Sequence, residues 1–225
     1  KRNLPAWNTF EPGSVMKSFL VASAINEGVI NDQTIIDCEN GQRRIGKYTI
    51  HDVNKKGKLD ISGVLRFSSN SGASKIIERI SNKKYYSYLK SLGFGTKTNI
   101  KLPGEAKGIL VAPEKWSQIQ AANISFGQGM STTSIQLAKA LSIVANGGVY
   151  IEPYLIKSIT NSEGKILFKN KNRAGKRILS YATSKKMRQL LKAVVEDGGG
   201  YKAQIDGISV SGKTGTGQVA IKGGY

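Results

Sequence analysis

The chain has 225 residues, 39% of them hydrophobic, which is enough for one sizeable core. It contains no run of 18 apolar residues, so no part of the printed sequence is predicted to span a membrane. Its formal net charge of +19 is spread along the whole chain without an arginine-rich arm, zinc finger or aromatic stacking motif, so charge alone does not indicate a nucleic-acid binder.

The first half of the chain predicts helices interrupted by a polar segment. Residues 1–13 look extended, and Ser14 to about Glu27 forms an apolar helix that ends at Gly28. Residues 35–60 are polar and rich in glycine, with short strand-like pieces such as 48–50, and His51 is expected in a loop. Further helices are predicted over 61–67, 71–80 and 84–92, and the first of these leads directly to Ser68.

The second half predicts more helices, a hairpin and a strand. Helices are expected over 113–122 and 131–145, and over 182–196 with Ser180 or Thr183 as the N-cap. Residues 154–168 are predicted to form a hairpin that turns at 161–164. Residues 208–220 alternate as a strand that carries Lys213. No internal repeat or linker divides the chain into two domains.

Three short motifs occur in a fixed order along the chain. They are Ser14-Val15-Met16-Lys17, Ser68-Ser69-Asn70 and Lys213-Thr214-Gly215. The first motif alone is unspecific, because Ser-x-x-Lys recurs at 81–84, 87–90 and 162–165, whereas Lys-Thr-Gly and Ser-x-Asn each occur once. In this order the three motifs indicate a serine acyl-transfer site with a serine nucleophile and a lysine one helical turn away.

Serine needs a nearby base because its hydroxyl is a weak nucleophile at neutral pH. The spacing places Lys17 on the same helix face as Ser14, one turn on. The positive helix N-terminus, a desolvated cleft and a second cation, Lys213, would each lower the pKa of Lys17. We therefore expect Ser14 as nucleophile and a neutral Lys17 as the base, with a surface lysine as the alternative.

The other two motifs supply candidates for proton transfer and substrate binding. Ser68 is expected to pass a proton to the leaving amine, and Asn70 to hydrogen-bond the substrate, although both residue types also cap helices. Lys213 offers a charge to a substrate carboxylate, and Thr214 and Thr216 offer hydroxyls. Gly215 would allow close backbone approach. The single cysteine and single histidine cannot form a zinc site of Cys and His ligands, and neither a metal nor another cofactor is expected.

The chain resembles class B penicillin-binding proteins, the septal or elongation peptidoglycan transpeptidases. The resemblance covers almost the whole chain and is carried by residues 10–14, 68–71, 125–129, 135–138 and 210–216. It implies an α+β domain in which helices pack on an antiparallel sheet, with the site at their junction. It also implies that the backbone N–H groups of Ser14 and Thr216 form an oxyanion hole.

The resemblance implies D,D-transpeptidation. Ser14 would attack the D-alanyl-D-alanine bond of a peptidoglycan stem peptide carried on a lipid-linked precursor, and a neighbouring amine would take the acyl group. Beta-lactam antibiotics would trap the serine. The implied partners include a glycosyltransferase and other division or elongation proteins, with no nucleic acid. The implied location is the extracytoplasmic face of the bacterial cytoplasmic membrane, through an anchor outside this chain. The positive charge fits either solvated lysine faces or attraction to an anionic envelope.

We expect residues 1–225 to be one transpeptidase domain that is truncated at both ends. Only thirteen residues precede Ser14 and ten follow Gly215, which leaves little room for the expected sheet beyond 208–220. A lone strand would expose unpaired backbone groups and apolar helix faces, so the isolated chain is expected to aggregate and to be poorly active.

Three alternatives remain open. A beta-lactamase would share the motifs, but the spacing of 145 positions from Ser68 to Lys213 is longer than small beta-lactamases usually have, and no matching deacylating carboxylate motif is found. A beta-lactam-sensing receptor or an inactive scaffold would not turn over wall peptides, although intact Ser14, Lys17 and Lys213 argue against the scaffold. A nucleic-acid binder would depend on charge alone.

Overall fold

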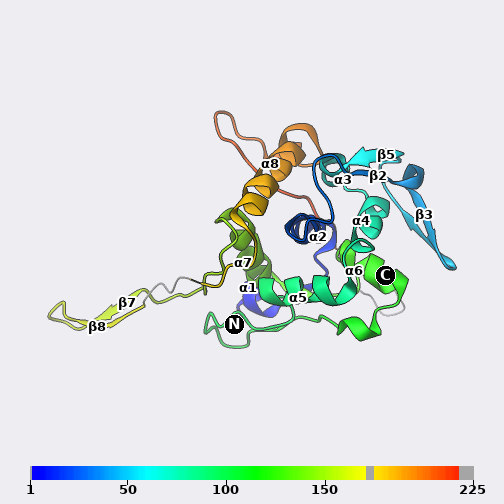
Figure 1. Ribbon diagram of the computed structural model, residues 1–225. Helices are drawn as coiled ribbons and strands as arrows, with labels where there is room; N and C mark the ends of the chain where they lie inside the picture. Colours follow the sequence, from blue (N-terminus) through cyan, green and yellow to red (C-terminus); the bar gives the residue numbers. More distant parts are fainter. Residues whose placement is uncertain (1, 171–174, 218–225) are drawn as a thin grey trace.

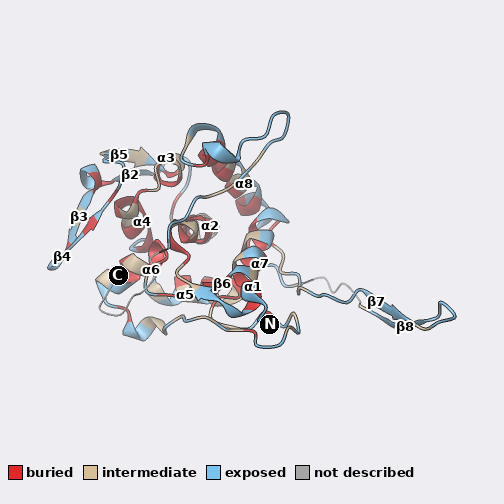
Figure 2. Cartoon of the chain, turned by 180° about the vertical axis from the view of Figure 1, so that it is seen from behind, coloured by how far each residue is buried: buried red, intermediate tan, exposed pale blue. Residues whose placement is uncertain are grey.

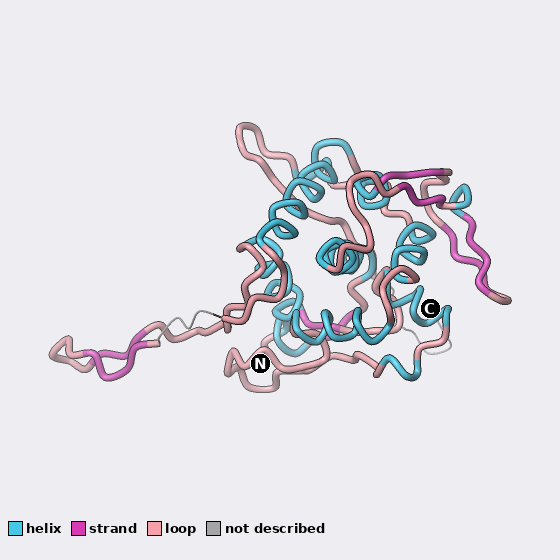
Figure 3. Tube along the Cα trace, in the orientation of Figure 1, coloured by secondary structure: helices cyan, strands magenta, loops and turns pink. Residues whose placement is uncertain are grey.

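The computed structural model describes residues 2–170 and 175–217, and its centre is the helix α2 (Met16–Asn26). Every residue from Met16 to Ala24 is buried, and Figures 1 and 3 show the helix surrounded by other elements. A helix that is apolar around its whole circumference requires such a central position. Phe19 on α2 meets Phe94 edge to face, with ring centroids 5.2 Å apart. The predicted apolar helix that begins at Ser14 is therefore the core of the domain.

Helices and short 3₁₀ turns, labelled η, surround α2. The helices α4, α5, α6 and α8 contact α2 directly. The helical elements are α1 (Leu4–Trp7), η1 (Gly13–Val15), η2 (Glu39–Gly41), α3 (Ile61–Arg66), α4 (Asn70–Ile77), α5 (Asn82–Leu92), η3 (Pro113–Lys115), α6 (Gln118–Ser125), α7 (Ser134–Ala145), α8 (Tyr181–Asp197) and η4 (Tyr201–Ala203). Among the described residues, no helix combines the length and the apolar character that a membrane crossing requires.

The strands of the described residues form four two-stranded antiparallel sheets. The pairs are β1 (Thr9–Phe10) with β6 (Thr132–Thr133), β2 (Ile35–Asp37) with β5 (Lys58–Asp60), β3 (Gln42–Ile45) with β4 (Tyr48–His51), and β7 (Ser158–Thr160) with β8 (Ile166–Lys169). The α+β class is thus confirmed. The pairs β2–β5, β3–β4 and β7–β8 lie at the outside of the helical body (Figure 3), whereas both residues of β6 are buried.

The predicted strand over 208–220 is wrong for its described part. Residues 209–217 belong to no strand, and residues 218–220 lie outside the described residues. The alternating pattern alone cannot make a strand, because a strand also needs a hydrogen-bonded neighbour. With other described residues, residues 209–217 form one backbone hydrogen bond, from Gly212 N to Leu191 O of α8 (3.1 Å), and Ile208 N donates to Ile205 O in an isolated bridge. The segment therefore lies over a helix instead of in a sheet.

The predicted hairpin is confirmed as β7 and β8. Asn161 organises its turn, since its side-chain oxygen accepts hydrogen bonds from the N–H groups of Glu163 (3.1 Å) and Lys165 (2.9 Å). The hairpin projects from the body of the molecule, and all residues of both strands are exposed (Figures 1 and 2).

Two predicted helix boundaries are wrong because capping residues set the starts. The helix predicted over 113–122 is split into η3 and α6, and α6 begins after Ser117, which forms a capping box with Gln120. The helix predicted over 131–145 begins at Ser134, because Thr133 caps it in the same way while pairing with β1. Of the two predicted N-caps of α8, Ser180 is the one observed, and its side chain accepts a hydrogen bond from Thr183 N.

Candidate active site

The fold brings Ser14 and Lys17 together at the start of α2. Ser14 lies in the turn η1, and Lys17 lies in the first turn of α2. The distance from Lys17 Nζ to Ser14 Oγ is 2.9 Å. The lysine is completely buried by the surrounding helices. The first motif thus brings the Ser14 hydroxyl and the Lys17 amine into contact, as its spacing predicted, and their roles as nucleophile and base stay predictions.

Lys17 Nζ contacts four oxygen atoms. It lies 2.6 Å from Ser68 O, 2.7 Å from Asn70 Oδ1, 2.9 Å from Ser14 Oγ and 3.2 Å from Ser68 Oγ. The two shortest contacts are to carbonyl oxygens, which only accept hydrogen bonds. In a neutral amine these two oxygens take both N–H groups, and the lone pair is left for a serine hydroxyl. The arrangement can therefore receive a proton from Ser14.

The electrostatic surroundings favour the neutral form of Lys17. Burial is the largest cause that holds the pKa of Lys17 well below its ordinary value, and the nearby Lys213 lowers that pKa further. Asp52 acts in the opposite direction and raises the pKa of Lys17. Two of the three predicted influences, desolvation and Lys213, are thus present.

Ser68 lies between the two lysines. Its Oγ is 3.2 Å from Lys17 Nζ and 3.0 Å from Lys213 Nζ. Its backbone has a φ of 56°, in the left-handed region that a serine seldom adopts. This conformation joins α3 to Ser69, the N-cap of α4. The strained link places both Ser68 and Asn70 beside Lys17, as the second motif predicted.

Lys213 belongs to the strandless segment 209–217, and its side chain extends to Ser68. Its Nζ donates to Ser68 Oγ and lies 3.1 Å from Thr214 O and 3.4 Å from Thr214 Oγ1. Burial lowers the pKa of Lys213 to about 8. The side chains of Thr214 and Thr216 belong to exposed residues and are open to a ligand.

Backbone packing holds the rest of this segment against the residues that precede Ser14. A Cβ atom on Gly215 would lie 2.7 Å from Val15 Cγ2 and 2.9 Å from Pro12 O, so only glycine fits without displacement. A Cβ atom on Gly13 would overlap Thr216 O. The backbones of Gly13 and Thr216 are therefore in close contact next to the nucleophile.

The turn that contains Gly127 packs against the backbone of Gly13, the residue before Ser14. Gly13 N donates to Gly127 O (3.1 Å), and a Cβ atom on Gly127 would overlap the backbone of Gly13. Gly127 also has a φ of 84°, which favours glycine. Glu11 Oε1 accepts a hydrogen bond from Gly129 N (2.9 Å). Residues 125–129 thus hold the chain that leads into Ser14.

Sequence reasoning missed Asp52. This carboxylate is 8% exposed and accepts hydrogen bonds from Ser69 Oγ (2.5 Å), Asn70 N (2.6 Å) and Ser71 N (3.0 Å). His51, which we expected in a loop, ends β4, and its carbonyl accepts a hydrogen bond from Asn70 Nδ2 (2.9 Å). The only sequence signal was an acidic residue after a strand-like run, and that signal is too common to select it.

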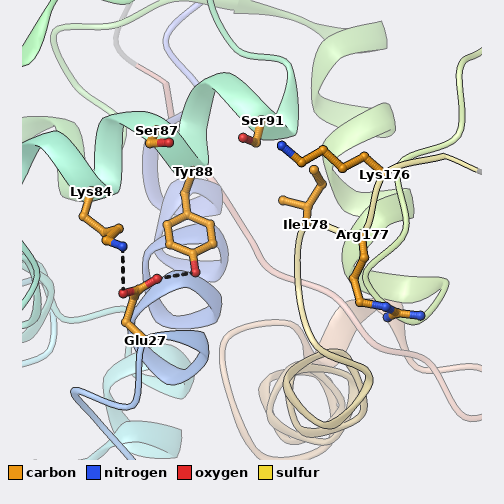
Figure 4. Close-up of a pocket in the computed structure, with 8 residues that line it drawn as sticks. All are labelled: Glu27, Lys84, Ser87, Tyr88, Ser91, Lys176, Arg177 and Ile178. Carbon is orange, nitrogen blue, oxygen red and sulfur yellow. Dashed lines mark hydrogen bonds and ion pairs between the residues drawn. The ribbon is translucent and has the colours of Figure 1, made fainter.

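A separate pocket of about 220 Å³ lies at the opposite end of α2 (Figure 4). In it, Glu27 accepts a hydrogen bond from the Tyr88 hydroxyl (2.6 Å) and pairs with Lys84 (3.3 Å). The pocket is lined by Glu27, Lys84, Ser87, Tyr88, Ser91, Lys176, Arg177 and Ile178. None of these is a predicted site residue. The described residues contain no cluster of three or more His, Cys, Asp or Glu side chains that could hold a metal ion.

Known proteins match the whole chain. The family described as the penicillin binding protein transpeptidase domain matches residues 1–225. "Stage V sporulation protein D" of Bacillus subtilis is 37% identical over 232 residues, which cover 100% of this chain and 35% of that protein. "Probable peptidoglycan D,D-transpeptidase PbpC" of Pseudomonas aeruginosa is 34% identical over 225 residues, which cover 100% of this chain and 38% of that protein. The chain thus spans little more than a third of the length of these relatives.

Solved structures match the fold as well. The transpeptidase domain of penicillin-binding protein 3 from Burkholderia pseudomallei has a TM-score of 0.89 and 30% identity, over 100% of this chain and 65% of that one. Penicillin-binding protein 3 from Mycobacterium tuberculosis, complexed with ampicillin, has a TM-score of 0.91 and 31% identity, over 98% of this chain and 50% of that one. The chain belongs to the family of class B penicillin-binding protein transpeptidase domains.

Proposed function

We propose that this chain carries the acyl-transfer site of a serine D,D-transpeptidase that cross-links peptidoglycan stem peptides. The observation that supports the proposal most strongly is the contact of 2.9 Å between Ser14 Oγ and the buried Lys17 Nζ. Relatives of the chain carry the name peptidoglycan D,D-transpeptidase, and one similar structure is a complex with ampicillin.

In the acylation step, neutral Lys17 takes the proton of Ser14 while Ser14 Oγ attacks the carbonyl carbon between the two D-alanines. The C–N bond of the tetrahedral intermediate then breaks, and D-alanine leaves with a proton delivered from Lys17 through Ser68 Oγ, which lies 3.2 Å from Lys17 Nζ. The stem peptide remains as an ester on Ser14. An amine of a second stem then attacks this ester and loses a proton to Lys17. The C–O bond to Ser14 breaks, and Lys17 returns the proton to Ser14 Oγ, which restores the serine and the neutral amine.

The Lys213 segment would bind the substrate. Lys213 and the hydroxyls of Thr214 and Thr216 face the carboxylate of the terminal D-alanine, and Asn70 contacts the peptide. Gly215 lets this segment pack against Val15 and Pro12 beside Ser14, which places the neighbouring threonines at the substrate. The N–H groups of Ser14 and Thr216 would stabilise the oxyanion, in keeping with the contact between the Gly13 and Thr216 backbones.

The assignment extends to partners and location. A beta-lactam presents the same carboxylate and a reactive amide, so it would acylate Ser14 as well. The wall precursor is lipid-linked, so the whole protein would act at the extracytoplasmic face of the bacterial membrane, with a glycosyltransferase and other division or elongation proteins as partners. The net charge of +19 suits an anionic envelope.

The test is covalent labelling of the full-length protein with a fluorescent penicillin. Mass spectrometry should place the adduct on the peptide from Phe10 to Lys17, and Ser14→Ala should abolish it. The neighbouring variant Ser18→Ala is the control, because Ser18 lies in α2 four residues after Ser14 and its hydroxyl has no hydrogen-bond partner among the described residues. An adduct elsewhere, or labelling that survives Ser14→Ala, would end the proposal. Rapid release of the adduct as hydrolysed penicillin would indicate a beta-lactamase instead.

A further inference from the structure

The carboxylate of Asp52 lies at the N-terminus of α4. It accepts the hydrogen bonds from Ser69 Oγ, Asn70 N and Ser71 N described above. A carboxylate is favoured there, because the first N–H groups of a helix have no partner within the helix and carry partial positive charge. These bonds fix where α4 begins, and Asn70 is the first residue of that helix.

The same group fixes the side chain of Asn70. Asn70 N is bound by Asp52, and Asn70 Nδ2 donates to the carbonyl of the preceding residue, His51 (2.9 Å). The amide group is therefore oriented with Oδ1 towards Lys17 Nζ, at 2.7 Å. An amide turned the other way would present N–H groups to the lysine and remove one of its two carbonyl acceptors. Residues 51 and 52 thus determine which atom of Asn70 meets the amine.

The hairpin β3–β4 holds Asp52 firmly. Asp52 N donates to Gly41 O (2.9 Å), and a Cβ atom on Gly41 would lie 3.1 Å from Asp52 Cβ. At the other end of α4, Arg43 on β3 donates to Ser74 Oγ (2.9 Å) and pairs with Glu78 (2.6 Å). The hairpin is therefore attached to both ends of α4, and the carboxylate cannot shift without the strands.

We propose that Asp52 is a positioning residue of the acyl-transfer site: it orients Asn70 and the start of α4 so that Lys17 holds its lone pair towards Ser14. The inference rests on the proposed function. The polar segment 35–60, which contains Asp52, would thus have a role in the reaction.

Asp52 also acts on Lys17 by its charge. Lys17 faces Ser14, Ser68 and Asn70, which are neutral, the cation Lys213, and the anion Asp52. Burial and Lys213 lower the pKa of Lys17, and Asp52 raises it. Removal of the negative charge should therefore lower this pKa further. A capping carboxylate that does not act on Lys17, such as Asp60 at the start of α3, would change stability without this effect.

The experiment measures the rate of acylation by a penicillin against pH in the full-length protein. Asp52→Asn keeps the shape but removes the charge and one acceptor. We expect the plateau rate to fall about tenfold or more, because a hydrogen bond to a charged group is lost. We also expect the acidic limb of the profile to move to lower pH. Asp60→Asn is the matched control, since Asp60 Oδ1 caps α3 (Gly63 N, 2.6 Å) away from Lys17, and it should leave the limb in place.

The outcomes separate the inference from the proposed function. If the parent is not acylated on Ser14, the proposed function fails and the inference fails with it. If the parent is acylated but Asp52→Asn keeps both plateau and limb, the inference alone is overturned, even when the melting temperature drops. Should Asp52→Asn not fold, Ser69→Ala removes one of the three donors and leaves the charge. It should lower the plateau several-fold with no change in the limb, and an unchanged plateau would overturn the inference.

Discussion

The two halves of the candidate site are held in different ways. In the first half, Ser14 lies in η1 and Lys17 in α2, while Ser68 lies in the link before α4 and Asn70 begins α4. The helices α2 and α4 pack in the buried core (Figure 2). Lys213 lies in a segment without a strand partner among the described residues, where Ser211 Oγ bonds to Arg188 O (3.0 Å) and Gly212 N to Leu191 O.

The difference shows what each half can contribute. The helical half excludes water from Lys17, and this desolvation is the largest cause of its lowered pKa. The Lys213 half remains partly open, so its cation and hydroxyls are available to a carboxylate. Activation of the serine should therefore depend on the first half, and substrate recognition on the second.

The largest effect should come from Lys17→Arg. Arginine keeps the positive charge but does not deprotonate usefully, so acylation by a penicillin should fall about 100-fold or more. Lys75→Arg is the control, because Lys75 pairs with Glu39 (2.6 Å) on the outside of α4. Stopped-flow acylation rates measure the change. A Lys17→Arg variant that is acylated at nearly the parent rate would mean that Lys17 supplies only charge.

Lys213→Ala should weaken recognition of the substrate carboxylate. A charge-assisted hydrogen bond contributes about 1.5–3 kcal/mol, so the acylation efficiency should fall roughly 10- to 100-fold for a substrate that has its carboxylate. For an analogue without the carboxylate the variant should lose much less. A double-mutant-style cycle, in which one change is Lys213→Ala and the other is removal of the substrate carboxylate, measures the coupling energy between the two groups. Additive losses would show that Lys213 does not meet that group.

The same variant should move the pH profile. Lys213 lowers the pKa of Lys17, so its removal should raise that pKa. A higher pH is then needed before half of the molecules have a neutral Lys17. The acidic limb of the acylation profile should therefore move to higher pH. Asp52→Asn is expected to shift it downwards. Shifts in the same direction in both variants would contradict the electrostatic account of the cluster.

The smallest effect concerns the support beneath Ser14. Gly127→Ala would place a methyl group on the Gly13 backbone, whereas Gly129→Ala meets no atom within 4 Å although its φ is 73°. Both variants place an alanine at a positive φ, which is unfavourable, but only Gly127→Ala also brings its methyl group into steric overlap with the Gly13 backbone. Thermal unfolding should show Gly127→Ala to be about 1–3 kcal/mol less stable than Gly129→Ala. Equal stability would mean that the turn does not hold the residue before the nucleophile.

The sequence predicted the elements that depend on local patterns. The apolar run after Ser14 predicted α2, the turn at Asn161 predicted the hairpin, and Ser180 predicted the start of α8. The three motifs also identified the side chains that meet at Lys17, since their chemistry constrains residue type and order. The order along the chain cannot give the distances, which come from the packing of α2 against α4.

Features that depend on a distant partner could not be predicted. The strand expected at 208–220 needed a neighbour, and the alternating pattern carries no information on whether one is present. Asp52 is selected by its position at the start of α4, seventeen residues before Ser69. Likewise, nothing in the motif Ser68-Ser69-Asn70 indicates that Ser68 adopts a positive φ or that Oδ1, rather than Nδ2, of Asn70 faces the lysine.

Burial among the helices is expected to keep Lys17 neutral, so that it can act as the base for Ser14. The most direct test is an NMR titration of the full-length protein with ¹³C-labelled lysine side chains, in which Lys17→Arg identifies the Lys17 signal. This signal is expected to titrate well below the ordinary lysine pKa of about 10.4, and below the signals of the solvent-exposed lysines. A Lys17 signal that titrates with the exposed lysines or above them would contradict it.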